Sequence, residues 1–186
     1  ARDVGLGLEL VFNKISIMLK NLDIPIIMQV RGAAAGIGCS YALSGDLIIA
    51  SSNAYFLQAF SNIGLVPDGG SAYLLANTVG RVKAMEMMLL GRRLSAAEAL
   101  EKDMITEVVE DRVLEEVAMN YAKTLAEGPT KTFGLIRKAA WAALDLNFED
   151  QLDLERQMQC DAGRTDDFVE GVMAFAQKRK PNFKGS

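Results

Sequence analysis

Residues 25–40 read Pro-Ile-Ile-Met-Gln-Val-Arg-Gly-Ala-Ala-Ala-Gly-Ile-Gly-Cys-Ser, a β-rich run that passes directly into a turn of small residues. Proline is tolerated at the first position of a strand, and consecutive apolar residues are typical of a buried one, so residues 25–30 are predicted to form a strand. A helix around Tyr41–Ser44 should end at Gly45, and Asp46–Ala50 should form the next strand. This order predicts a parallel pair of strands in an α/β fold.

Helical patterns dominate outside this unit. Apolar spacing predicts a helix over residues 5–22, and residues 54–57 are expected to form a weaker strand before an irregular stretch over 60–70. Ser95 and Glu98 form a capping-box motif that opens another helix. The remaining predicted elements are helices over 71–79, 82–90, 112–127, 130–144, 148–162 and 165–179 and a strand within 104–110. We therefore expect a sheet-containing part over 1–110 and a helical region over 111–186.

The composition argues against several classes of protein. The chain has 186 residues, half of them apolar, and a net charge of −4. Nucleic-acid binding requires a basic face, so a nucleic-acid partner is not expected. No stretch approaches the roughly 20 apolar residues of a membrane span, and no secretory signal is recognisable. These features predict a cytoplasmic protein without a membrane partner.

Histidine is absent from the sequence, and cysteine occurs only as Cys39 and Cys160. Nucleophile pairs that depend on histidine and histidine-ligated metals are therefore excluded within these residues. Both thiols are expected to be reduced and packed as small apolar side chains, and no metal site is predicted. Acid–base chemistry must come from carboxylates, tyrosines or lysines.

Two motifs could carry chemistry. In the small-residue turn Gly32–Gly38, glycines let a backbone approach a ligand, and the N–H groups at a helix start can bind an anion; close packing of helix on strand explains the turn equally. The turn matches neither a P-loop nor a dinucleotide fingerprint. The second motif is Ile63-Gly-Leu-Val-Pro-Asp-Gly-Gly70, where Asp68 stands among apolar residues. Desolvation would raise the pKa of Asp68 and make it a stronger base, but Pro-Asp-Gly is also ordinary turn chemistry.

In order and spacing, several motifs together resemble the crotonase superfamily of enoyl-CoA hydratases and isomerases. They are residues 25–38, Gly45-Asp-Leu-Ile-Ile-Ala50, the Asp68 motif and Gly91-Arg-Arg-Leu-Ser-Ala-Ala-Glu-Ala99. The stretches 151–156, 163–175 and 178–183 resemble the 1,2-epoxyphenylacetyl-CoA isomerase branch in particular. The resemblance implies a crotonase-like spiral of ββα units with a C-terminal helical trimerisation region, and a homotrimer or hexamer.

The resemblance also implies a chemistry. The substrate would be an acyl-CoA thioester, so that coenzyme A is part of the substrate and no separate cofactor is needed. The thioester enolate would be held by two backbone N–H groups, one of them on Ile37 after Gly36. The other belongs to a family segment that would precede Ala1, and the family's first strands and helix are expected to lie there too.

Departures from the family pattern indicate the reaction type. Related hydratases carry two glutamates whose positions fall on Ser40 and Phe60, and neither residue can activate water. Family isomerases use one acid at the position of Asp68, which implies an isomerase that moves a proton, and with it a double bond, or rearranges a ring epoxide. The alternatives are an enoyl-CoA hydratase and a non-catalytic CoA-binding or scaffolding homologue.

Further binding roles are carried over with less support from the residues themselves. Besides Gly36, the acyl pocket is expected to use Pro67 and an apolar wall that could equally belong to the core: Phe60, Ile63, Leu65 and Val66. The CoA phosphates could meet basic residues near the C-terminus, which could equally be a solvated tail: Lys178, Arg179, Lys180 and Lys184.

Overall fold

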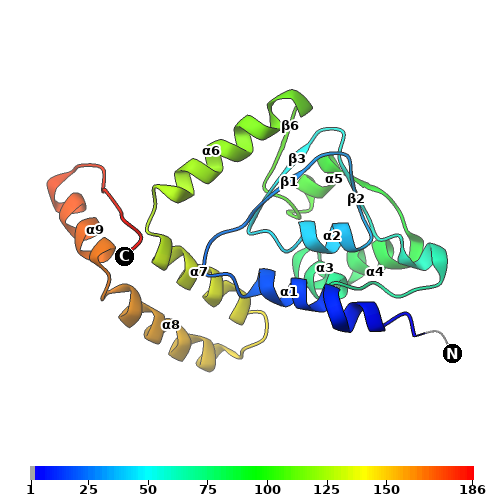
Figure 1. The fold of residues 1–186 in the computed structure, drawn as a ribbon, viewed down its shortest axis with the longest axis horizontal. Helices are drawn as coiled ribbons and strands as arrows, with labels where there is room; N and C mark the ends of the chain where they lie inside the picture. Colours follow the sequence, from blue (N-terminus) through cyan, green and yellow to red (C-terminus); the bar gives the residue numbers. More distant parts are fainter. Residues whose placement is uncertain (1–2) are drawn as a thin grey trace. The chain divides into compact units, whose positions relative to one another are not determined.

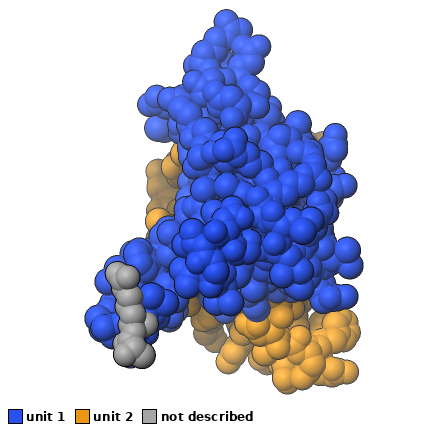
Figure 2. All heavy atoms as spheres, turned by 90° about the vertical axis from the view of Figure 1, so that its right-hand side faces the viewer, with its two compact units in different colours: residues 1–20, 26–119 blue, residues 21–25, 120–186 orange. Residues whose placement is uncertain are grey.

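The computed structural model describes residues 3–186 (Figure 1). The chain divides into two compact units, which Figure 2 shows in different colours. The first runs to Lys20 and resumes over Ile26–Met119, and the second comprises Asn21–Pro25 and Asn120–Ser186. Among the described residues, no helix is both long and apolar enough to cross a membrane.

The first unit contains a parallel sheet built on the predicted strand pair. Strand β1 (Ile27–Val30) pairs in parallel with β3 (Leu47–Ser51), in the register that places Ile27 opposite Leu47. Strand β6 (Glu107–Val109) joins the other edge of β3, also in parallel. The centre of β3 is fully buried, as expected for a middle strand of a covered sheet.

A second small sheet corrects the prediction of a simple turn between residues 32 and 38. Residues Ala33–Ala35 form strand β2, which pairs in parallel with β4 (Tyr55–Leu57), and β5 (Leu94–Ser95) pairs antiparallel with β4. Ala34 lies opposite the fully buried Phe56. Pairing with β4 and packing on a large aromatic neighbour thus favour a strand where the alanines alone favour none.

Short helices cover the sheets of the first unit. The predicted helix over 5–22 is divided into a π-helical turn and an α-helix, and the helix predicted around Tyr41 begins already at Ile37. The capping box of Ser95 and Glu98 is confirmed. The helical elements are η1 (Leu8–Phe12), α1 (Asn13–Lys20), α2 (Ile37–Ala42), η2 (Phe60–Ile63), α3 (Ser71–Thr78), α4 (Gly80–Leu90), α5 (Ala96–Glu101) and η3 (Asp111–Val113).

The second unit is helical, as predicted. Thr165 caps α9 by accepting a hydrogen bond from the N–H of Phe168. Cys160 is exposed on α8, which corrects the prediction that both thiols are packed; Cys39 is buried. The helices are α6 (Leu114–Ala126), which runs across the boundary between the units, α7 (Thr130–Ala142), α8 (Phe148–Ala162) and α9 (Asp166–Gln177).

One glycine fixes the packing of α7 within the second unit. A Cβ at Gly134 would lie 2.3 Å from the backbone oxygen of Asp23, and Arg137, one turn further on, donates a hydrogen bond to the Leu22 oxygen at 2.8 Å. Gly134→Ala is therefore expected to lower the free energy of unfolding by about 1–3 kcal/mol, because backbone cannot yield as a side chain can. In α9 a Cβ at Gly171 meets only ordinary contacts, 3.5 Å from Phe183, so Gly171→Ala is the control in urea denaturation. Equal stability of the two variants would contradict this packing.

Candidate active site

The loop Pro67–Gly70, here called the acid loop, lies directly against the first turn of α2. A Cβ added to Gly69 would lie 3.1 Å from Cγ1 of Ile37 and 3.0 Å from Cβ of Ser40. Gly69 has a φ of +62°, so only glycine meets both the conformation and the close approach. The acid loop therefore carries Asp68 to the helix start that the sequence singled out.

Gly36 turns the chain from β2 into α2. Its N–H donates to the oxygen of Leu57 at 2.9 Å, which extends the pairing of β2 with β4, and its backbone then takes φ 54° and ψ −129°. Ile37 follows as the first residue of α2, and the N–H of a first helical residue has no acceptor within its own helix. The turn thus presents an amide donor beside the acid loop.

The carboxyl group of Asp68 is partly withdrawn from water. Its Oδ1 atom is buried and accepts no hydrogen bond from any of residues 3–186. Burial raises the pKa of Asp68 above its ordinary value. An unpaired, desolvated carboxylate is a stronger base than a solvated one, so of the two interpretations of the Pro-Asp-Gly motif the geometry favours the chemical one.

Two titratable side chains of α2 have raised pKa values, and one of them, Tyr41, interacts with Asp68. Burial, and after it the negative charge of Asp68, raises the pKa of Tyr41, whose hydroxyl donates to the Phe12 oxygen at 3.4 Å. Burial raises the pKa of the Cys39 thiol to about 11, so Cys39 is not a thiolate nucleophile at neutral pH. The proximity of Tyr41 to Asp68 is not predictable from sequence, because nothing in the spacing of the two residues indicates it.

Positions 40 and 60 are both buried. Ser40 is fully inaccessible and its hydroxyl donates to the backbone oxygen of Asp68 at 2.9 Å. Phe60 is 8% exposed, and its ring lies 3.7 Å from where a Cβ of Gly36 would be. Neither position holds a second acid.

The apolar residues between Phe60 and the acid loop point outward. Ile63 and Val66 are 73% and 80% exposed and Leu65 is 41% exposed, so these three do not belong to the core. Pro67 is half-buried. An exposed apolar stretch directly before the acid loop is a suitable wall for an apolar ligand.

Two of the four basic residues near the C-terminus, Arg179 and Lys180, form ion pairs. Nζ of Lys180 lies 2.8 Å from a carboxylate oxygen of Glu127, and Arg179 makes two hydrogen bonds to Glu170, whose pKa falls to about 2. Lys178 ends α9 in a left-handed conformation. A phosphate at Lys180 would have to replace Glu127.

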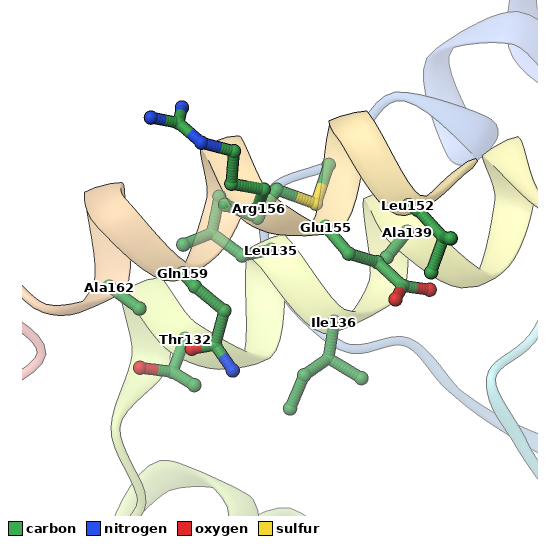
Figure 3. A pocket seen from close by; sticks show the side chains of 10 residues that line it. Thr132, Leu135, Ile136, Ala139, Leu152, Glu155, Arg156, Gln159 and Ala162 are labelled. Carbon is green, nitrogen blue, oxygen red and sulfur yellow. The ribbon is translucent and has the colours of Figure 1, made fainter. Parts of the chain in front are cut away.

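A groove of about 560 Å³ lies in the second unit between α7 and α8. Figure 3 shows it with Leu135 and Ile136 on α7 and with Leu152 and Gln159 on α8. Its lining is largely aliphatic and includes none of the predicted site residues. The groove therefore provides apolar surface, with Glu155 and Arg156 among its polar lining residues.

Comparison with known proteins shows similarity over nearly all of the chain. The model of the enoyl-CoA hydratase/isomerase family matches residues 9–186. A 1,2-epoxyphenylacetyl-CoA isomerase of Escherichia coli is 45% identical over 185 residues, which is 100% of this chain and 71% of that protein. A trans-2-decenoyl-[acyl-carrier-protein] isomerase of Streptococcus mutans is 37% identical, covering 93% of this chain and 66% of that protein.

Solved structures show the same likeness in three dimensions. The crystal structure of an enoyl-CoA hydratase subunit I from Geobacillus kaustophilus superposes with a TM-score of 0.93 at 35% identity, covering 100% of this chain and 72% of that one. Both isomerases and hydratases therefore occur among the similar proteins.

Proposed function

Because the chain belongs to the enoyl-CoA hydratase/isomerase family and has the crotonase fold, we propose that it is an acyl-CoA isomerase with Asp68 as its acid–base residue. The family acts on acyl-CoA thioesters. The observation that carries the proposal is the single desolvated carboxylate, Oδ1 of Asp68, beside the amide turn of Gly36 and Ile37. Coenzyme A enters as part of the substrate.

In the proposed reaction, Asp68 removes the proton from the carbon next to the thioester carbonyl. Negative charge then develops on the carbonyl oxygen, and the N–H of Ile37 stabilises it as one donor of an oxyanion hole. Asp68, now protonated, returns the proton farther along the acyl chain, so that the double bond moves and no water is added. A raised pKa suits both halves of this transfer, since the group must take up and release a proton near neutral pH.

The site offers less support for hydration. Addition of water to a double bond needs a group that activates the water in addition to the group that handles the α-proton. Ser40 is buried and already donates to Asp68 O, and Phe60 has no proton to transfer. The hydratase named among the solved structures keeps this reaction as the second candidate.

The remaining contacts are part of the same proposal. The acyl chain would be lined by Gly36, Phe60, Ile63, Leu65, Val66 and Pro67. Lys178 would meet the CoA phosphates across a subunit boundary, and Lys180 could do so only if it leaves Glu127. The helical C-terminal region would pack against further copies in a trimer or hexamer. Exposed apolar side chains on α9, such as Phe168, Val172 and Phe175, support that packing.

Incubation with matched substrates tests the reaction type. We expect the full-length protein to convert a 3-enoyl-CoA into the conjugated 2-enoyl-CoA, and to form little 3-hydroxyacyl-CoA from the 2-enoyl-CoA. Chromatography of both reaction mixtures gives the ratio of double-bond migration to hydration. Formation of mainly 3-hydroxyacyl-CoA would instead establish the hydratase, and tight binding of acyl-CoA without either product would indicate the non-catalytic homologue.

A further inference from the structure

Ser40 connects the helix that begins at Ile37 to the acid loop that carries Asp68. It is the fourth residue of α2 and is fully inaccessible. Its Oγ lies 2.9 Å from the backbone oxygen of Asp68, but 3.5 Å from the oxygen of Gly36. Of these two carbonyl oxygens, the nearer one is the better acceptor for the hydroxyl proton, and it belongs to the acid residue itself.

Ser71, at the start of α3, completes the connection. Its hydroxyl makes a very short contact with the hydroxyl of Ser40, and its N–H donates to the same Asp68 oxygen at 3.1 Å. A hydroxyl can donate and accept, so either serine can supply the proton shared between the two hydroxyls. The Asp68 carbonyl thus receives two buried donors, one from α2 and one from α3.

The acid loop has little freedom to shift on this support. Gly69 is pressed against Ile37 and Ser40, and its oxygen accepts a hydrogen bond from the hydroxyl of Ser16 at 3.3 Å. The same short helix that offers the Ile37 amide therefore also holds the backbone of the acid. Buried polar groups that all have hydrogen-bond partners favour a single arrangement of the backbone, because any other arrangement would leave buried donors without acceptors.

We propose that Ser40 and Ser71 form a hydroxyl latch that sets the position of the Asp68 carboxylate relative to the Ile37 amide, which makes Ser40 a positioning residue. The inference rests on the proposed function of Asp68 and adds to it the reason why a serine stands at position 40. The hydroxyl of Ser40 reaches the Asp68 carbonyl where the acid loop comes so close that a Cβ on Gly69 would lie 3.0 Å from Cβ of Ser40. Both serines of the latch are fully inaccessible to solvent.

Ser44 supplies the matched control. It is also a buried serine, two residues beyond the end of α2, and its hydroxyl donates to the Ser40 backbone oxygen at 3.1 Å instead of to the acid loop. In the full-length protein, Ser40→Ala is expected to lower kcat for double-bond migration about tenfold with KM changed by less than about twofold. Ser44→Ala should leave both constants within about twofold, although it loses one buried hydroxyl as well.

Two readouts separate the latch from general destabilisation. Amide hydrogen exchange of Ser71 should accelerate in Ser40→Ala and not in Ser44→Ala, because only the former loosens the carbonyl that Ser71 binds. Ser71→Ala should lower kcat in the same direction, and the double variant should lose about as much as the larger single effect, since both residues act through one connection. Ser71→Ala also serves if Ser40→Ala does not fold.

The results distinguish this inference from the function on which it rests. Equal kcat and equal Ser71 exchange in Ser40→Ala and Ser44→Ala would overturn the latch, even if Asp68→Asn abolishes turnover. A second outcome is faster Ser71 exchange in Ser40→Ala together with turnover that does not need Asp68. This result would confirm the hydrogen-bonded connection between the serines and the acid loop, but it would overturn both the positioning role of Ser40 and the role of Asp68 as the base.

Discussion

Asp68→Asn is expected to lower kcat for double-bond migration by about 10²–10⁴-fold, the usual contribution of a general base. The asparagine side chain keeps the size of the carboxyl group and cannot take up the proton. No other carboxylate is present in the described part of the acid loop or in α2 to replace it. KM for the acyl-CoA should change little, because the lost interaction acts in proton transfer and not in binding.

The control for this variant is Asp103→Asn. Asp103 is an exposed acid with a φ of 53°, a conformation that asparagine tolerates well, so this variant removes the same charge without touching the site. Its kcat should equal that of the wild type. A similar kcat for Asp68→Asn and Asp103→Asn would remove Asp68 from the mechanism.

The same substitution should also stabilise the fold at neutral pH. Burial raises the pKa of Asp68, so the folded state keeps this proton at pH values where the unfolded chain has already lost it. The free energy of unfolding therefore falls as the pH rises from the unfolded to the folded pKa. At pH values above the folded pKa, Asp68→Asn avoids this loss of stability. Below about pH 4 it gains nothing, because Asp68 is then protonated in both the folded and the unfolded state. Urea denaturation at several pH values measures the difference, and a variant less stable at neutral pH would contradict the desolvation.

Gly36→Ala is expected to have the second large effect, a loss of about 10²–10³-fold in kcat, as for removal of an oxyanion donor. The backbone at Gly36, with φ 54° and ψ −129°, is rarely open to a residue with a Cβ. The neighbours would accept the methyl group, because Phe60 lies at an ordinary contact distance of 3.7 Å. The strain is therefore relieved by rotation of the backbone at residue 36. This rotation turns the Ile37 N–H away from the position where the thioester oxygen is proposed to bind.

Gly80→Ala separates this effect from loss of stability. Gly80 has a φ of +76° and open space around it, at the start of α4 and outside the acid loop and α2. Both variants should unfold more easily, by about 1–3 kcal/mol for such strain. Only Gly36→Ala should lose kcat when the assay is run well below both melting temperatures. Equal losses of kcat would mean that the direction of the Ile37 amide does not matter.

The fold was largely predictable where one pattern dominated. The parallel pairing of β1 with β3 follows from the order of strand, helix and strand, and the caps at Ser95 and Thr165 follow from local sequence. Strand β2 was not predictable, because three alanines have no strand preference and only the register with β4 makes them one. The position of Cys160 on the exposed side of α8 likewise depends on which face the helix buries.

The candidate site was predictable only in part, and for a related reason. Asp68 and Gly36 stand out in the sequence as an acid among apolar residues and a glycine before a helix. The latch does not, since Ser40 and Ser71 are 31 positions apart and ordinary serines in any local pattern. Tertiary structure likewise determines the exposure of Ile63 and Val66 and the pairing of Lys180 with Glu127. Sequence motifs thus indicate candidate groups for the chemistry, and the structure shows which contacts hold them.

Exchange of an acyl-CoA α-proton with solvent tests the central claim most directly, because it follows proton removal without requiring any later step. A saturated acyl-CoA incubated with the protein in heavy water should incorporate deuterium next to the thioester carbonyl, as monitored by proton NMR. The wild type and Asp103→Asn should catalyse this exchange, and Asp68→Asn should not. Exchange at the wild-type rate in Asp68→Asn would contradict the account.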